Sequence, residues 1–200
     1  MGTSDGGRLT QAERVQTARD RLLDAAAELV IEHGYHATTA AAIADRAGYS
    51  REMVRVRFGN KLTLMRELLV TEYQEGLDIE LDPGVDALAY LRNSVEQLAL
   101  MSVTAPTRLR AAFVLGFEAG TSVPELRDDL VPWLEQIEGR FANQLRAAVA
   151  EGSIRAIDCE EYARLLIATG TGGAFLFMTS PDATKDPAAP MRTILDSLIL

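Results

Sequence analysis

Four basic side chains lie within eleven residues, between Arg51 and Lys61. Arg51, Arg55 and Arg57 carry guanidinium groups and Lys61 an ammonium group, and such groups bind phosphate oxygens and the acceptor edge of guanine. The same segment holds Val56, an apolar side chain that suits contact with a thymine methyl group. This combination indicates binding to a nucleic acid. The alternative is a solvated basic helix of the kind found in many helical proteins.

The basic residues fall in a predicted helix-turn-helix. Thr39 and Ser50 are good N-cap residues for helices over residues 40–47 and 51–58. Gly48, between the two helices, can take the left-handed conformation that ends a helix. A helix, a short glycine-containing turn and a second helix form the layout in which the second helix enters a DNA groove.

The second predicted helix has two faces. At about 100° per residue, Val54 and Phe58 fall on the side that faces the core, and Glu52 and Val56 fall on the opposite side. The residues predicted to contact DNA are Thr39, Ser50, Arg55 and Lys61 toward the backbone, Arg51, Glu52, Met53 and Val56 toward bases, and Thr38 and Arg57, which lie beside them.

A set of short motifs occurs in a fixed order between Arg21 and Leu69: Leu22-Leu23-x-x-Ala26, Gly34-Tyr35, Thr38-Thr39, Ile43-Ala44, Ala47-Gly48-Tyr49-Ser50, Phe58-Gly59-Asn60-Lys61 and Leu64. In the order and spacing of these residues the chain resembles the TetR/AcrR family of one-component transcriptional repressors. The resemblance covers about a quarter of the chain and implies an all-helical homodimer with an N-terminal DNA-binding domain and a C-terminal domain that binds a small-molecule effector.

The second helix departs from the family pattern. The resemblance implies Gly in place of Glu52, Thr in place of Met53, an aromatic residue in place of Arg55, and often His or Tyr in place of Arg57. The guanidinium of Arg55 can replace the aromatic contact to phosphate by its charge. The carboxylate of Glu52 repels phosphate unless it accepts a hydrogen bond from a cytosine amino group or instead favours the helix dipole.

The net charge of −9 is unevenly distributed along the 200 residues. Residues 8–66 hold ten Lys and Arg against seven Asp and Glu, a balance of +3, whereas residues 67–200 hold ten against twenty-one, a balance of −11. The basic charge is therefore concentrated in the segment predicted to bind DNA, and we expect its affinity to depend steeply on salt.

Cysteine content and hydropathy limit the cellular context. The single cysteine, Cys159, excludes an internal disulfide. No apolar run reaches the length of a membrane span, and the first ten residues do not form a signal peptide. We therefore expect a cytoplasmic protein without a membrane partner.

The remaining sequence predicts helices only. No segment alternates with period two for long enough to form a sheet, so the fold class is all-α, with about nine helices. The predicted domains are a disordered arm (1–9), a helix-turn-helix domain of three helices (10–66) and an effector-binding and dimerisation domain (67–200). The predicted helices outside the helix-turn-helix cover residues 10–34, 61–80, 85–103, 106–119, 122–150, with a kink or split at Pro132, 159–179 and 191–200, and Asp82-Pro83-Gly84 breaks the chain after the second of these.

An effector pocket is expected among the helices over 85–150. Ligand sites are usually apolar with a few polar groups, and this favours a hydrophobic effector. For each candidate the alternative is an ordinary core position. The candidates are Tyr90, Met101, Phe113, Phe117, Trp133, Ile137 and Phe141, with Arg110 and Glu118 as polar contacts.

The almost wholly apolar helix 159–179 predicts burial on all sides and therefore a partner subunit. By the family resemblance, residues 159–179 and 190–200 form a four-helix dimer interface, in which the small residues Gly170 to Gly173 fit a close helix crossing. A phosphate-binding loop is disfavoured because this run follows no strand and is not followed by a GK[ST] signature.

The sequence favours a dimeric transcriptional regulator, a repressor that an effector releases from a two-fold symmetric operator in double-stranded DNA. The alternative is a ligand-binding helical dimer with little or no specific DNA binding. An enzyme is disfavoured because no nucleophile is paired with a histidine. His33 and His36 have no further ligand placed to complete a metal site, so neither a metal nor another cofactor is expected.

Overall fold

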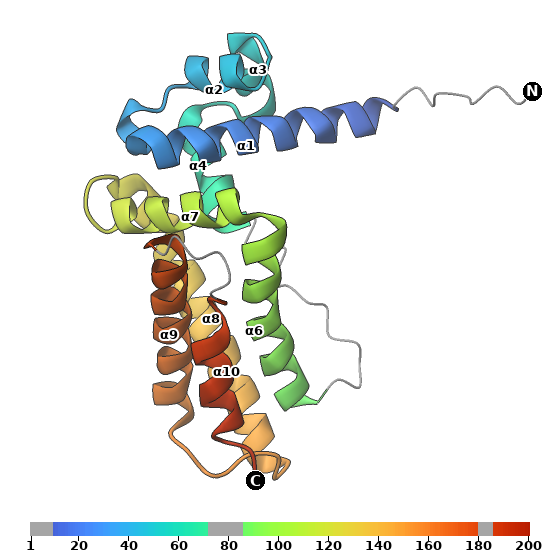
Figure 1. Ribbon diagram of the computed structural model, residues 1–200, viewed down its shortest axis with the longest axis vertical. Helices are drawn as coiled ribbons and strands as arrows, with labels where there is room; N and C mark the ends of the chain where they lie inside the picture. Colours follow the sequence, from blue (N-terminus) through green and yellow to red (C-terminus); the bar gives the residue numbers. More distant parts are fainter. Residues whose placement is uncertain (1–9, 72–85, 180–185) are drawn as a thin grey trace, which may run out of the picture.

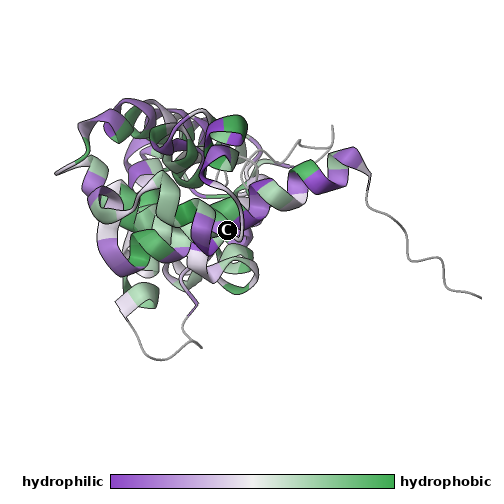
Figure 2. Ribbon diagram, turned by 90° about the horizontal axis from the view of Figure 1, so that it is seen from above, coloured by the Kyte–Doolittle hydropathy of each residue, from purple (hydrophilic) through white to green (hydrophobic). Residues whose placement is uncertain are grey.

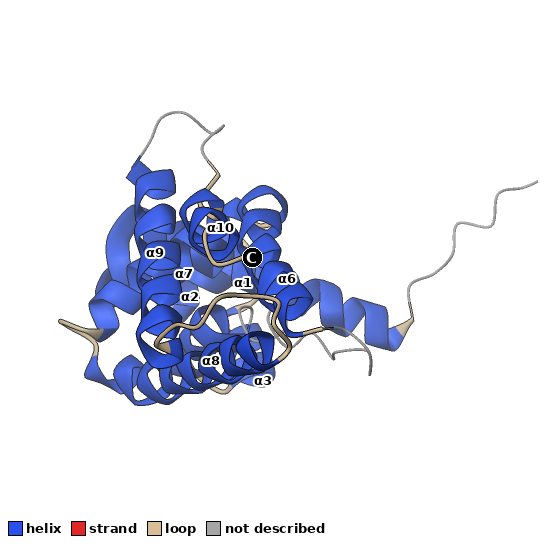
Figure 3. Ribbon diagram, turned by 90° about the horizontal axis from the view of Figure 1, so that it is seen from below, coloured by secondary structure: helices blue, strands red, loops and turns tan. Residues whose placement is uncertain are grey.

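The computed structural model describes residues 10–71, 86–179 and 186–200. Within these ranges the chain forms nine α-helices and one π-helical turn, without a strand, and this confirms the all-α prediction (Figure 3). Three predictions lie outside the described residues: the arm over 1–9, the second half of the helix over 61–80, and the Asp82-Pro83-Gly84 break.

The N-terminal region consists of α1 (Gln11–Ala37), α2 (Ala40–Arg46) and α3 (Arg51–Phe58). A capping box starts α1: Glu13 N donates to Thr10 Oγ1 at 3.2 Å, and Thr10 N donates to Glu13 Oε2 at 2.6 Å. Gly34 breaks the regular helix with φ +76°, near the predicted end, and a short turn follows to Ala37. The polar first turns of α1 extend away from the rest of the molecule (Figure 2).

The chain then passes through α4 (Lys61–Arg66) directly into the π-helical turn η1 (Glu67–Thr71). Asn60 caps α4, accepting from Thr63 N at 2.9 Å, as a short polar side chain at this position favours. The predicted domain boundary at residue 66 therefore falls inside a continuous helical segment.

The C-terminal region holds α6 (Ala87–Thr104), α7 (Pro106–Ala119), α8 (Pro124–Ala150), α9 (Cys159–Thr179) and α10 (Ala189–Asp196). Helix α7 lies between the N-terminal helices and a bundle of α6, α8, α9 and α10 (Figure 1). Helix α8 continues through Pro132, so the predicted split at this residue is wrong. Pro132 is exposed, and a carbonyl left without its helical N–H donor can face water there.

Two large clusters of buried apolar residues form the core. The first cluster contains residues of α1, α2, α3, α4 and η1, together with Leu115 and Ala119 of α7 and Leu126 of α8. The second joins α6, α8, α9 and α10. Because α7 contributes to the first cluster, the helix-turn-helix core extends across the predicted domain boundary, and that boundary stays a prediction.

Two glycines of α9 pack within the chain. The crossing between subunits that the family resemblance implies for this run stays a prediction, whereas Gly170 and Gly173 are buried against the segment around α10 of the same chain. A Cβ on Gly173 would overlap the carbonyl oxygen of Pro187, and a Cβ on Gly170 would lie 2.8 Å from Met191 Sδ. This close approach within one chain explains why residues 170 and 173 are glycine.

Among the described residues, no single helix is long and apolar enough to cross a membrane; α6 and α7 meet the length and composition only together, and they are bent by 112° relative to one another.

Candidate nucleic-acid interface and ligand cavity

Local sequence signals fix the orientation of α3. Thr39 caps α2, accepting from Ala42 N at 3.1 Å, and Gly48 takes φ +75° in the turn that follows. Val54 and Phe58 are buried in the first core cluster. Since these two side chains anchor one face of α3, the opposite face is directed away from the protein.

The outer face of α3 carries several of the residues predicted to contact DNA. Arg51, Glu52, Arg55 and Val56 are all exposed, and Val56, although apolar, is 62% exposed. Met53 instead lies half-buried against the core. The structure therefore brings four of the predicted contact residues together on one accessible surface, which we call the reading face (Arg51, Glu52, Arg55 and Val56).

The reading face contains an ion pair. Arg55 Nε donates to Glu52 Oε1 at 2.7 Å, and Arg55 Nη2 donates to the same oxygen. This hydrogen-bonded pairing lowers the pKa of the Glu52 carboxyl and raises that of Arg55. Both side chains are therefore charged at neutral pH, and the pair as a whole carries no net charge.

Lys61 is bound to the end of α1. Its Nζ donates to the Tyr35 carbonyl oxygen at 2.9 Å and lies 3.9 Å from the centre of the Tyr35 ring. Partial burial lowers the pKa of Lys61, and the nearby carboxylate of Glu118 opposes that shift. The ammonium thus holds the start of α4 against α1, close to the end of α3.

The other predicted contact residues differ in accessibility. Thr39 and Ser50 are exposed and Arg57 is half-buried. Thr38 is fully buried, and its hydroxyl donates to the Gly34 carbonyl oxygen at 2.8 Å. The prediction that the Thr38 side chain contacts DNA is therefore wrong, because this side chain is buried and hydrogen-bonded at the end of α1. The adjacent Thr39 is exposed and remains a candidate contact.

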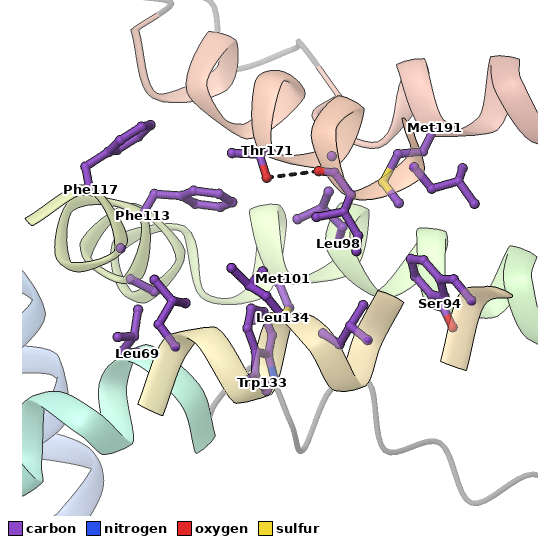
Figure 4. A pocket seen from close by; sticks show the side chains of 18 residues that line it. Leu69, Ser94, Leu98, Met101, Phe113, Phe117, Trp133, Leu134, Thr171 and Met191 are labelled. Atoms are coloured by element: carbon purple, nitrogen blue, oxygen red, sulfur yellow. Dashed lines mark hydrogen bonds between the residues drawn. The ribbon is translucent and has the colours of Figure 1, made fainter. Parts of the chain in front are cut away.

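A cavity of about 270 Å³ lies in the C-terminal region. Helices α6, α7, α8 and α9 supply most of its lining, with single residues from η1 and α10 (Figure 4). Six of the nine candidate pocket residues line it: Met101, Phe113, Phe117, Trp133, Ile137 and Phe141. Phe113 is directed between the helices, whereas the exposed Phe117 lies at the outer end (Figure 4).

The other three candidates are absent from the lining of this cavity. Tyr90 is buried in the second core cluster and is not among the lining residues of this cavity. The guanidinium of Arg110 lies 5.3 Å from the centre of the Phe177 ring. Glu118 bonds to α1, as described below. Tyr90, Arg110 and Glu118 therefore do not line this cavity.

Polar groups are few in this cavity. Its lining contains no charged residue, and the hydroxyls of Ser94 and Thr171 donate to carbonyl oxygens within their own helices. Without a charged partner at the wall, burial of an ionic group is unfavourable. The cavity therefore suits an uncharged, largely apolar molecule.

Sequence patterns alone did not indicate several lining residues. Leu69 comes from η1 and Met191 from α10, far away in the sequence. Leu166 and Thr171 lie in the apolar run that was assigned to dimerisation. No local signal distinguishes these positions from ordinary core, because their place in the lining depends on how distant helices pack.

Helix α7 connects the cavity to the helix-turn-helix. Phe113 and Phe117 line the cavity, and the neighbouring Glu118 accepts from Tyr35 N through both carboxylate oxygens, at 3.0 and 3.2 Å. His36 Nε2 lies 3.2 Å from the Ser122 carbonyl oxygen in the same junction. The turn after Gly34 is thus hydrogen-bonded on one side to α7 and the loop after it, and on the other to Lys61.

Metal chemistry has no visible support in the described ranges, where no group of three or more His, Cys, Asp or Glu side chains is placed to hold an ion. Cys159 is buried, and that burial raises the pKa of its thiol. A raised pKa disfavours the thiolate that nucleophilic chemistry requires.

Comparison with known proteins relates the N-terminal region to bacterial regulators. Residues 22–68 match the family model described as bacterial regulatory proteins, tetR family. The HTH-type transcriptional activator FasR of Mycolicibacterium smegmatis is 37% identical over 98 residues, which are 48% of this chain. The matched region spans only 43% of FasR.

Solved structures extend the similarity of fold across most of the chain. A TetR-family regulator from Rhodococcus sp. superposes with a TM-score of 0.74 at 20% identity, over 90% of this chain and 98% of the other. The complex of SmeT with triclosan gives 0.71 at 24% identity, over 92% and 93%. SmeT is the repressor of a multidrug efflux pump of Stenotrophomonas maltophilia.

Proposed function

Since residues 22–68 place this chain in the tetR family of bacterial regulatory proteins, we propose that it is a sequence-specific DNA-binding transcriptional regulator. The observation that carries this proposal is the reading face of α3. The exposed apolar Val56 lies opposite the buried Val54 and Phe58, and the guanidinium-bearing Arg51 and Arg55 are exposed beside it on the same helix. In a helix-turn-helix, such a surface enters the major groove.

The proposed contacts follow from exposure. Arg51, Glu52 and Val56 face base edges, and Thr39 and Ser50 lie at the N-termini of α2 and α3, where hydroxyls and backbone N–H groups bind phosphate. Lys61 supports this surface from behind through Tyr35. Bacterial duplex DNA as partner implies that the protein acts in the cytoplasm.

The regulator acts as a homodimer in this proposal. Helix α9 lies at one edge of the bundle (Figure 1) and exposes Leu165, Phe175 and Leu176, and Leu200 is exposed at the C-terminus. Burial of these side chains against a second copy would remove apolar surface from water. An interface formed by residues 159–179 and 190–200 would relate two reading faces by a two-fold axis, and the operator would have the same symmetry.

The effector is an apolar small molecule that binds in the cavity. The likeness to SmeT, whose structure contains triclosan, supports this ligand class. Effector binding would favour a conformation in which the two reading faces no longer fit one operator. We propose repression as the default action, released by the effector. FasR carries the name of an activator, so the direction of regulation requires a transcription assay.

The experiment is selection of full-length protein against random duplex DNA at about physiological salt, followed by sequencing. A two-fold symmetric motif supports the proposal. Arg51→Ala should weaken binding to the selected duplex by roughly 10-fold or more, as loss of a base contact does. Arg127→Ala removes the same charge from an exposed position on α8 and should leave the affinity within about twofold, because electrostatic effects are screened over roughly 10 Å.

A second measurement tests the effector. Triclosan serves as the apolar probe, with release of the selected duplex and a change in Trp133 fluorescence as readouts. Release that Phe113→Ala abolishes would support the cavity as its site.

The second candidate is a ligand-binding dimer without specific DNA recognition. The carboxylate of Glu52 on the reading face favours this candidate, because it repels phosphate. Failure to enrich any motif, with triclosan binding retained, would establish the second candidate over the first.

A further inference from the structure

The geometry of the Glu52–Arg55 pair determines which N–H donors of the guanidinium remain free to bind another group. Arginine has five N–H donors. The carboxylate oxygen of Glu52 accepts from Nε and from Nη2, which form one side of the planar group. The two parallel N–H bonds at the end of the group, one from Nη1 and one from Nη2, remain directed outward.

This end of a guanidinium matches one base in particular. Guanine presents two acceptors, O6 and N7, in the major groove, and a bidentate arginine contact to them is the commonest specific contact. A second contact on the side of the guanidinium fixes its plane. The cost of ordering a long flexible side chain is then partly met before DNA arrives.

The same carboxylate disfavours the alternative partner of Arg55. Phosphate binds by charge, and the pair presents no net charge to it. Both side chains are mostly exposed, 72% for Arg55 and 58% for Glu52, so neither is required for packing. Glu52 therefore weakens the sequence-independent contact between Arg55 and phosphate, and it leaves Arg55 able to make a directional contact with a base.

We infer that Glu52 and Arg55 act together as a specificity element, in which the Glu52 carboxylate holds the Arg55 guanidinium in the plane that contacts guanine. Arg55 is then a base-contacting residue, and Glu52 is a positioning residue. This assignment replaces the backbone contact that the sequence predicts for Arg55. It rests on the proposed function, since it requires sequence-specific DNA binding.

The test compares variants on the duplex selected by the wild-type protein and on duplexes with each base pair of a half-site changed in turn. Glu52→Gln keeps the size of the side chain and removes its charge. Arg55→Lys keeps the charge of Arg55 and removes its planar fork. Asp45→Asn removes one carboxylate from an exposed position on α2 of the same domain and serves as the matched control.

The inference gives a distinct pattern of affinities. Arg55→Lys should reduce discrimination at one G·C pair per half-site by roughly 10-fold, the size of a lost bidentate contact. Glu52→Gln should reduce discrimination at the same pair by about 3-fold and raise the affinity for unrelated DNA, because one fewer negative charge faces the phosphates. Asp45→Asn should leave discrimination at that pair unchanged.

Two outcomes separate the inference from the proposed function. If the wild-type protein selects a motif, but both α3 variants change the affinity for all duplexes by one common factor, Arg55 contacts phosphate and the inference is wrong. If the wild-type protein selects no motif, the proposed function fails, and the specificity element fails with it.

Discussion

The helix-turn-helix and the C-terminal bundle pack their apolar residues differently. In the N-terminal region Leu22, Ile43 and Leu64 are fully buried in a continuous cluster. The bundle is also apolar inside, but Phe113 and Leu134 face a cavity of about 270 Å³. One region therefore fills its interior, and the other leaves part of it empty.

This difference corresponds to two physical tasks. A surface that fits a groove must hold its side chains in fixed positions, and close packing restricts their movement. A ligand site requires space and exposed apolar atoms, and it loses van der Waals contacts when it is empty. We therefore expect stability to concentrate in the first cluster and ligand response in the second.

The largest expected effect is a loss of stability specific to the filled core. Leu64→Ala should lower the free energy of unfolding by about 3 kcal/mol, since a fully buried side chain leaves a new void. Leu134→Ala enlarges a space that already exists and should cost less than about 1.5 kcal/mol. Urea unfolding at one protein concentration measures both variants. Equal losses would contradict the difference in packing between the two regions.

A smaller loss of stability is expected at a tightly packed position of the bundle, outside the lining of the cavity. Gly173→Ala should destabilise the protein by about 2 kcal/mol, because the new methyl group overlaps the Pro187 carbonyl oxygen. Thermal unfolding followed by circular dichroism provides the measurement.

The neighbouring glycine provides the control. A Cβ on Gly172 meets no described atom within 4 Å, so Gly172→Ala should be neutral within one chain or stabilise α9 by up to about 1 kcal/mol. A loss as large as that of Gly173→Ala would point to a neighbour outside the chain, such as a second subunit.

A third prediction concerns the connection between the two regions. Glu118→Ala leaves Tyr35 N without its acceptor and should cost about 1 kcal/mol of stability. Glu118→Gln keeps an acceptor and should cost less. Triclosan-induced release of DNA should weaken in Glu118→Ala if α7 transmits the signal. Full release with unchanged stability would exclude this junction as the route.

The smallest effect is on a single ionisation. Arg55 stabilises the ionised form of Glu52, so the contribution of the pair is present above the ordinary pKa of glutamate and is lost as the pH falls through the lowered value. Arg55→Gln should return the pKa of Glu52 toward its ordinary value in a carbon-13 NMR titration. Arg51→Gln should leave it low. An unchanged pKa in Arg55→Gln would show that the pair is not populated in solution.

The sequence predicted the elements whose signals are local. The N-cap at Thr39 and the left-handed Gly48 occur where short-range patterns indicate them, and Ser50 precedes α3 as predicted but makes no capping bond with its side chain. Capping and backbone conformation depend on a few adjacent residues, so one sequence is enough to predict them. The outward face of α3 followed from helical periodicity in the same way.

Contacts between distant segments were not predictable. The burial of Thr38, the bond from Glu118 to Tyr35 and the approach of Gly173 to Pro187 depend on tertiary packing. Composition identified aromatic candidates for the cavity, and most of them line it. It did not distinguish Tyr90, which fills the core, from Phe113, which faces the cavity, because both are large aromatic residues on amphipathic helices.

The turn after Gly34 also sets a condition for protein engineering. A chimaeric regulator joins the DNA-binding half of one protein to the sensing half of another, and the predicted domain boundary would place that join at residue 66. A Cβ on Gly34 would lie 2.9 Å from Glu118 Oε1, and Arg108 pairs with Asp24 at 2.6 Å. A graft at residue 66 would separate these partners. A functional chimaera of this protein should therefore transfer α7 together with the N-terminal helices, so that the exchangeable module is discontinuous in sequence.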